Sequence, residues 1–203
     1  MHIIVLLLAL IGHVLGIVPT QEESEQIIEK FTRVREKVSP AASNMNHLTY
    51  SKEMEKRAKS WLSYCLYQLP SPSRHPEFAT TGMLLQSTFK LNQGFRGVDV
   101  FAKESKNYNY VDNSCKGSCS RYKQIVWAAS TEVGCAKAKC HDRKSSRPIY
   151  YMACVFNNAD NYLEERPYEK GVSCSQCPQG VACLRNQCAA KMGQNTTASF
   201  AVL

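Results

Sequence analysis

The sequence predicts a single α+β domain followed by a C-terminal segment held by disulfides. Three observations carry this prediction: apolar residues recur at helical spacing in four segments, two later segments have strand composition, and cysteines crowd near the C-terminus. With 203 residues, the chain is long enough for one globular domain with an appendage and too short to make two large domains the expected arrangement.

Residues 1–16, MHIIVLLLALIGHVLG, are apolar and end in small residues, which is typical of a secretory signal peptide. A membrane anchor is the alternative, but the apolar stretch is shorter than the roughly 20 residues that a spanning helix needs, and His13 interrupts it. We therefore expect cleavage after Gly16, export to the extracellular space and no stable membrane insertion.

All ten cysteines lie beyond this segment, and an even number in an oxidising compartment predicts five disulfides and no free thiol. Zinc is the alternative for CSQCPQGVACLRNQC, which has ligand-like spacing, but an exported protein is expected to pair these thiols.

The formal net charge is +8, and the densest cationic run is KAKCHDRKSSR, from Lys137 to Arg147. We read this run as a solvated loop between strands, with attraction to anionic glycans or lipid head groups as the alternative. Nucleic acid is not an expected partner, because the chain has no recognisable module for reading it.

The first helix is expected to begin after Thr20, because Thr20 and Glu23 form a capping-box pattern. Its apolar residues at helical spacing are Ile27, Phe31, Val34 and Val38, before Pro40. Ser51 can cap a second helix, whose apolar side is Met54, Ala58, Trp61, Leu62 and Cys65. A weaker helical pattern covers residues 98–108, and Ser120 can cap a fourth helix containing Tyr122, Ile125, Val126 and Ala129.

Residues 132–140 and 147–156 have the apolar and aromatic composition of two strands joined by the basic loop. After Pro167 there are too few apolar residues for a core, so this segment must be held by its own disulfides, each contributing about 2 to 4 kcal/mol. We expect a disordered tail at residues 191–203, in which Asn195 is a glycosylation acceptor.

No catalytic motif is present for a serine nucleophile, a zinc peptidase or a phosphate-binding loop. The mature chain keeps only His47, His75 and His141, and we interpret His75 and His141 as exposed loop residues. A papain-like cysteine is excluded if every thiol is paired. A hydrolase is kept as a further alternative, and it would need turnover that is sensitive to mutation of His75 or His141.

Several segments together resemble the CAP superfamily of cysteine-rich secretory, antigen 5 and pathogenesis-related 1 proteins. SRYKQIVWAASTEVGCA is similar to the motif G-H-[FY]-T-Q-x-V-W with its later V-G-C, and YMACVFNNADNY is similar to the second signature. PAASNMNHLTYSKEMEKRAKSWLSYC and PYEKGVSCSQCP resemble the upstream helix and the hinge, in the right order. With its short cysteine pair just before the first motif, the sequence is similar to secreted venom-allergen-like proteins of parasitic worms.

The resemblance implies an α-β-α sandwich with a small, mostly antiparallel sheet at residues 17–168 and a cysteine-rich hinge at residues 169–190. It also implies five disulfide pairs: Cys65 with Cys140, Cys135 with Cys154, Cys115 with Cys119, Cys174 with Cys183, and Cys177 with Cys188.

The family's cleft carries two histidines and two glutamates that can hold a divalent cation. Matched residue by residue, three of these positions fall on Leu69, Met83 and Arg121, and only Glu104 is retained. An apolar pair and a guanidinium cannot ligate zinc, so the resemblance implies no metal site, no other cofactor and no enzymatic activity. A cation at the start of a helix needs an anionic partner, which predicts an ion pair between Arg121 and Glu104.

The resemblance implies lipid capture in place of catalysis. Tyr108 and Tyr110 lie where the family's sterol-binding aromatic pair lies, with ordinary packing as the alternative. Ile27, Phe31 and Val34 are candidates for a fatty-acid groove, although core packing is the favoured interpretation. The expected function is non-enzymatic binding of a sterol or fatty acid, with recognition of a host or extracellular protein. An interaction or immunomodulatory module without a lipid ligand is the alternative.

Overall fold

The computed structural model describes residues 16–90, 94–95, 97–141, 147–159 and 162–189. Its helices are α1 (Gln21–Arg35), α2 (Lys52–Leu62), α3 (Gly97–Ala102) and α4 (Ser120–Ile125), with 3-10 helices η1 (Pro76–Phe78) and η2 (Lys103–Asn107). Its strands are β1 (Thr49–Tyr50), β2 (Gly82–Thr88), β3 (Tyr108–Asn109), β4 (Ser114–Cys115), β5 (Glu132–His141), β6 (Pro148–Phe156), β7 (Ala182–Leu184) and β8 (Gln187–Ala189).

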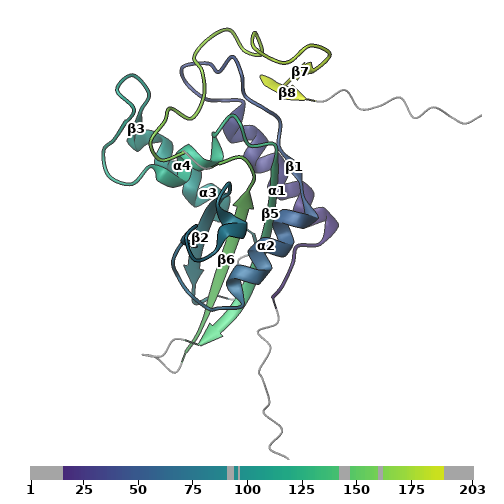
Figure 1. Cartoon of the computed structure of the whole chain (residues 1–203), viewed down its shortest axis with the longest axis vertical. Coiled ribbons are helices and arrows are strands. Elements are labelled where there is room, and N and C mark those ends of the chain that lie inside the picture. The colour runs from purple at the N-terminus through teal and green to yellow at the C-terminus, as the bar shows by residue number, and fades with distance from the viewer. Residues whose placement is uncertain (1–15, 91–93, 96, 142–146, 160–161, 190–203) are drawn as a thin grey trace, which may run out of the picture.

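One sheet of strand order β1-β5-β6-β2 forms the centre of the molecule (Figure 1). β5 and β6 pair antiparallel with Cys135 opposite Cys154, and β2 pairs antiparallel with β6. Only β1 runs parallel to its neighbour, β5. The two predicted strands and the mostly antiparallel sheet are therefore confirmed, whereas β1 and β2 were not predicted.

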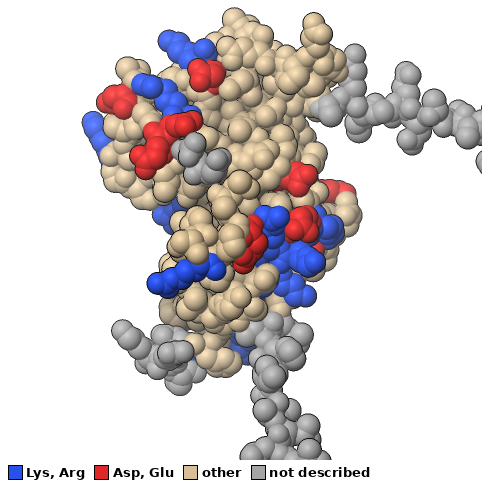
Figure 2. All heavy atoms as spheres, in the orientation of Figure 1, with Lys and Arg blue, Asp and Glu red and all other residues tan. Residues whose placement is uncertain are grey.

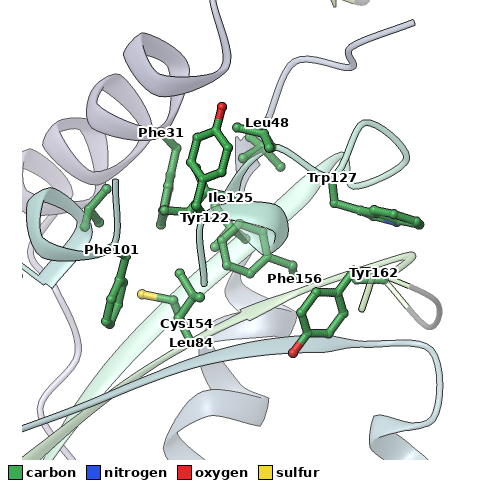
Figure 3. Close-up of a cluster of buried hydrophobic side chains, with 14 of the residues drawn as sticks. Phe31, Leu48, Leu84, Phe101, Tyr122, Ile125, Trp127, Cys154, Phe156 and Tyr162 are labelled. Carbon is green, nitrogen blue, oxygen red and sulfur yellow. The ribbon is translucent and has the colours of Figure 1, made fainter. Parts of the chain in front are cut away.

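Helices cover both faces of this sheet, which confirms the predicted sandwich. Along β6, Ala153 and Val155 belong to the apolar cluster under α2, while Cys154 and Phe156 belong to the cluster under α1, α3 and α4 (Figure 3). This alternation follows from the two-residue period of a strand. The same period puts neighbouring residues of β2, Leu84 and Leu85, into opposite clusters.

The first two helices begin where the capping patterns predict. Thr20 Oγ1 accepts from the Glu23 amide at 3.1 Å, while the Glu23 carboxylate accepts from the Thr20 amide at 2.9 Å. Ser51 Oγ accepts from the Met54 amide at 3.4 Å. The cap of each helix satisfies an amide that has no partner within the helix.

Helix ends differ from the prediction in three places. α1 ends at Arg35, so Val38 lies beyond it and packs, partly buried, against the core. Cys65 lies past the end of α2 with a φ of 51°. The pattern over residues 98–108 gives two short pieces, α3 and η2, followed by β3.

Five disulfides join the described cysteines in the pairs that the family resemblance implies. They are Cys65–Cys140, Cys115–Cys119, Cys135–Cys154, Cys174–Cys183 and Cys177–Cys188. Cys65–Cys140 ties the loop after α2 to the end of β5, and Cys135–Cys154 joins the two central strands.

The cysteine-rich hinge is held by more than its own disulfides, which corrects the expectation from its composition. Arg185 donates to Glu36 and to Glu29 of α1, both at 2.6 Å. The Cys188 amide donates to the Met45 carbonyl at 2.7 Å, and the His47 amide donates to the Cys188 carbonyl at 2.9 Å. The hinge is therefore docked on the domain by charges and by backbone hydrogen bonds.

Charges of both signs share the face shown in Figure 2. Blue and red atoms are mixed over α2, where Arg57 pairs with Glu53 at 3.2 Å and Lys52 pairs with Glu55 at 3.0 Å. The positive net charge thus forms no single-sign patch over this helix. Within the described ranges, no helix has the length and apolarity needed to cross a membrane.

Candidate functional site

Three sequence-distant residues, which the resemblance places at the family's metal-ligating positions, line one cleft of about 240 Å³. Leu69 comes from the loop after α2, Met83 from β2, and Arg121 from the first turn of α4. The full lining is Tyr67, Gln68, Leu69, Met83, Leu84, Leu85, Ser120, Arg121 and Tyr162. The cleft therefore has an apolar floor and one cationic wall.

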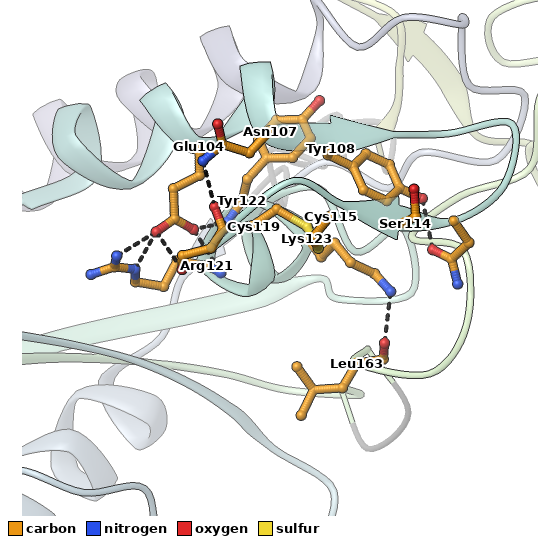
Figure 4. The surroundings of a disulfide bond; sticks show 12 residues. Glu104, Asn107, Tyr108, Ser114, Cys115, Cys119, Arg121, Tyr122, Lys123 and Leu163 are labelled. Atoms are coloured by element: carbon orange, nitrogen blue, oxygen red, sulfur yellow. Dashed lines mark hydrogen bonds and ion pairs between the residues drawn. A yellow bond between two sulfur atoms is a disulfide. The ribbon is translucent and has the colours of Figure 1, made fainter.

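The predicted ion pair between Arg121 and Glu104 is present (Figure 4). Arg121 Nε donates to Glu104 Oε1 at 2.6 Å, and Nη2 contacts the same oxygen. The guanidinium also lies 5.2 Å from the ring centre of Phe101, within the range of a cation–π contact. The head group is consequently held from two sides.

Glu104 also caps α4, which corrects the prediction that Ser120 does so. Ser120 is the first residue of the helix, and the preceding Cys119 makes no side-chain cap. The Glu104 carboxylate instead accepts from the amides of Arg121 and Tyr122 at 3.1 and 3.3 Å. A carboxylate from η2 thus satisfies the amides that a local cap would satisfy.

A divalent cation does not fit this cleft. Leu69 and Met83 offer no hard donor, and Glu104 Oε1 already accepts from Arg121 and, at 3.1 Å, from Ser118 Oγ. A guanidinium carries a permanent charge of the same sign as the ion. Among the described residues there is also no group of three or more His, Cys, Asp or Glu placed to hold a metal.

A second, larger groove of about 610 Å³ lies at the tyrosine loop. Its lining is Ser39, Pro40, Tyr108, Asn109, Tyr110, Val111, Arg166 and Lys170. We call it the tyrosine groove. Both predicted aromatic residues line it, together with residues from the segment after α1 and from the start of the hinge.

Hydrogen bonds hold the tyrosine loop in place. Tyr108 Oη donates to Asn113 at 2.9 Å, and Tyr110 Oη donates to the Tyr168 carbonyl at 2.8 Å. The rings of Tyr110 and Tyr168 stack at 4.9 Å, and Arg166 donates to the carbonyls of Tyr110 and Val111. Burial raises the pKa of Tyr108 to about 12, so its phenol is neutral at physiological pH.

The model of the cysteine-rich secretory protein family matches residues 28–156. The chain belongs to this family. Proteins of the family are generally not enzymes.

Curated relatives agree with this assignment. Mouse cysteine-rich secretory protein LCCL domain-containing 1 is 31% identical over 83% of this chain, and bovine GLIPR1-like protein 1 is 31% identical over 81%. The chain spans only 37% of the mouse protein and 70% of the bovine one.

Solved structures show the same fold. Na-ASP-1 matches with a TM-score of 0.70 and 20% identity, over 85% of this chain and 48% of that one. Venom allergen-like protein 4 of Schistosoma mansoni matches with a TM-score of 0.58 and 26% identity, over 78% of this chain and all of that one.

The apolar residues of α1 pack in the hydrophobic core of the domain. Ile27 and Phe31 are 1% and 0% exposed, and Val34 is partly buried against the same cluster. A fatty acid would have to displace this packing to reach them. Their role in a fatty-acid groove stays a prediction.

The three histidines in the described ranges, His47, His75 and His141, line neither cleft. His141 is exposed, as predicted. His75 is half-buried, because its ring packs 4.9 Å from Trp61, which corrects the prediction of an exposed residue. Burial lowers the pKa of His47. Asn195 and the basic loop at residues 142–146 lie outside the described residues.

Several cleft and groove residues were missed by the sequence analysis: Tyr67, Gln68, Leu84, Leu85, Ser120 and Tyr162 in the cleft, and Ser39, Pro40, Arg166 and Lys170 in the tyrosine groove. They come from loops and strands far apart in the chain, and no local pattern marks them. Exposed apolar Leu69 and Tyr67, at 48% and 52%, become informative only once the fold brings them to a concave surface.

Proposed function

We propose that this chain is a secreted, non-enzymatic member of the family that binds a sterol-like hydrophobic ligand in the tyrosine groove. The observation that carries the proposal is the groove itself: it brings both tyrosines together with Pro40 and exposed Val111 around about 610 Å³. Ligand pockets for small molecules are commonly about 300 to 1,000 Å³.

The chemistry of the groove supports a ligand with a large apolar body and one polar end. Tyr108, Tyr110, Pro40 and Val111 supply apolar surface, and Val111 is 81% exposed. Their burial by a ligand is favourable by roughly 25 cal/mol per Å² of apolar area. The polar rim is provided by Ser39, Arg166 and Lys170.

Both tyrosine hydroxyls keep the capacity to recognise a hydroxyl group. Each donates its own proton to a protein acceptor, Asn113 or the Tyr168 carbonyl. Each oxygen retains lone pairs, which can accept from the hydroxyl of a sterol. A neutral phenol also avoids the cost of covering a charge with an apolar ligand.

Export is the second part of the proposal. Residues 1–16 supply the signal, and the five disulfides are the state expected in an oxidising compartment. Mass spectrometry of protein secreted from insect cells should give a mature chain that begins at Ile17. A glycan on Asn195 is expected in the same spectrum.

Recognition of an extracellular or host protein is the alternative function. The hinge and the basic run from Lys137 to Arg147 are the segments proposed for such contact, and neither needs a lipid. Purified protein that takes up no sterol or fatty acid but still engages a protein partner would favour this alternative.

The sterol proposal is tested with tritiated cholesterol and a competing excess of unlabelled sterol. Saturable uptake should fall at least tenfold in a Tyr108→Ala, Tyr110→Ala variant, because two ring faces are lost from the groove. The matched control is Tyr64→Ala, Phe89→Ala. These two rings are 55% and 63% exposed and lie outside the groove.

Near-UV circular dichroism should show that both double variants remain folded. Uptake that is equal in the two double variants would refute the tyrosine groove as the sterol site. Uptake absent from wild-type protein would refute the ligand class.

A further inference from the structure

Leu69 and Met83, which the resemblance places at metal-ligating positions, do not fill the cleft between them. They and seven other residues line about 240 Å³ of space. At roughly 30 Å³ for one water-sized group, this space takes about eight such groups. Leu69 and Tyr67 remain half-exposed at its rim, so the cleft is open to solvent.

Arg121 presents a fixed cation to this space. Its Nε and Nη2 are used by Glu104, and Phe101 lies beside the guanidinium. Nη1 has no partner among the described residues, and 39% of the side chain is exposed. An arginine whose orientation is already fixed loses little conformational entropy when it binds an anion.

Glu104 occupies only one edge of this guanidinium, and its carboxylate accepts from other donors as well. The amides of Arg121 and Tyr122 and the hydroxyl of Ser118 also donate to the carboxylate. Glu104 is 8% exposed at its side chain and faces these groups, whereas Arg121 lines the cleft. Ser120, whose hydroxyl has no partner in the described part of the chain, lies next to Arg121 on the same wall.

We infer that this cleft binds a small organic acid, with its carboxylate on Arg121 Nη1 and its apolar group between Leu69 and Met83. A charge-assisted hydrogen bond to a guanidinium selects an anion, and the apolar floor selects a hydrocarbon or aromatic body. The sulfur of Met83 favours contact with a ring. This inference is independent of the tyrosine groove.

The test is isothermal titration with 3-phenylpropionate and with 3-phenylpropanol, which has the same body without the charge. Wild-type protein should bind one equivalent of the acid about tenfold to a hundredfold more tightly than the alcohol. Arg121→Gln should remove this preference and leave the affinity for the alcohol unchanged.

A second variant keeps the test valid if Arg121→Gln does not fold. Leu69→Glu places a carboxylate at the exposed rim, where it repels the acid and competes for Arg121, so acid binding should weaken at least tenfold. Leu66→Glu is the matched control, since Leu66 is 42% exposed in the same loop and does not line the cleft. It should bind the acid as the wild type does.

Equal affinities for acid and alcohol in the wild type would overturn the inference. So would an acid preference that survives Arg121→Gln, or no acid binding up to about 10 mM. Sterol uptake should be unchanged in Leu69→Glu, and phenylpropionate binding should be unchanged in the Tyr108→Ala, Tyr110→Ala variant. The two proposed sites can therefore be refuted independently of each other.

Discussion

The carboxylate of Glu104 binds Arg121 at two places, the guanidinium and the backbone amide. One acidic side chain thus fixes the cationic wall of the cleft and also caps the helix that carries it. Losing Glu104 and losing Arg121 should differ in effect. Glu104 accepts from further donors, whereas Arg121 hydrogen-bonds no other side chain in the described part of the chain.

Removing Glu104 should cost more stability than removing Arg121. Glu104→Ala leaves the Arg121 guanidinium and two helix amides without an acceptor, and we expect the free energy of unfolding to fall by about 2 to 4 kcal/mol. Arg121→Ala leaves Glu104 with its amide and hydroxyl donors and should cost under about 1.5 kcal/mol. Urea denaturation of the two variants measures both values, and equal losses would contradict this order.

Arg35 should be irreplaceable by lysine. Its guanidinium is fully buried and donates to the carbonyls of Asn46, Ile125, Trp127 and Ser130. An ammonium group has fewer donors and no planar fork, so Arg35→Lys leaves buried carbonyls unpaired and should cost about 3 kcal/mol or more.

Arg33→Lys is the control for that substitution, because its side chain is 66% exposed on the same helix. It should change the free energy of unfolding by less than about 0.5 kcal/mol. Burial lowers the pKa of Arg35 to about 9, and stability would rise with pH only above that value. Between pH 6 and 8, Arg35 should therefore add no slope to the stability of the wild type.

Docking of the hinge should weaken in acid. Hydrogen bonds from Arg185 lower the pKa of Glu29 from 4.5 to about 2 and lower that of Glu36. Carboxylates with depressed pKa values stabilise the docked state above their unfolded value, and this contribution is lost as pH falls from about 4.5 towards 2. The amides of Cys188 and His47, which bond across the contact, report docking through their hydrogen-exchange protection factors.

Arg185→Gln should lower these protection factors at pH 7 and remove most of their change between pH 4.5 and 2. Lys170→Gln, which removes an equal charge near the start of the hinge, is the control and should keep the wild-type profile. A pH profile that is identical in wild type and Arg185→Gln would show that the backbone hydrogen bonds alone hold the hinge.

Gly134 should tolerate no side chain. A Cβ there would lie 2.0 Å from the Glu55 amide nitrogen and 2.4 Å from the Ser51 carbonyl oxygen, both in the backbone at the start of α2. Gly134→Ala must push α2 off the sheet, and we expect a loss of at least about 3 kcal/mol in thermal or urea unfolding. Gly171→Ala meets no backbone atom but the side chains of Ser43 at 2.9 Å and Ser175 at 3.7 Å, and it should cost clearly less.

The fold was predictable where the signal is local. The capping box at Thr20 and the aromatic composition of β6 each act within a few residues, and both predictions are confirmed. β2 was missed because Met83, Leu84 and Leu85 are consecutive apolar residues, packed on both faces, and show no alternation.

The site was predictable only in part, because its contacts are long-range. The family motifs identified Glu104 and Arg121 and the ion pair between them. The capping of α4 by Glu104 was not visible, since Ser120 offers a plausible local cap while the actual acceptor lies on η2. Likewise, Arg35 reads as an ordinary cation in the last turn of a helix, although its acceptors lie up to 95 residues away.

The tyrosine loop and the hinge share a mechanical connection. Arg166 donates hydrogen bonds to the carbonyls of Tyr110 and Val111, and Tyr110 stacks on Tyr168. The hinge begins at the residue after Tyr168. A change in the position of the hinge would therefore change the position of Tyr110, which lines the groove. A ligand in the groove and a protein bound to the hinge could each prefer one position of this segment. In that case each would change the affinity of the other by the same factor.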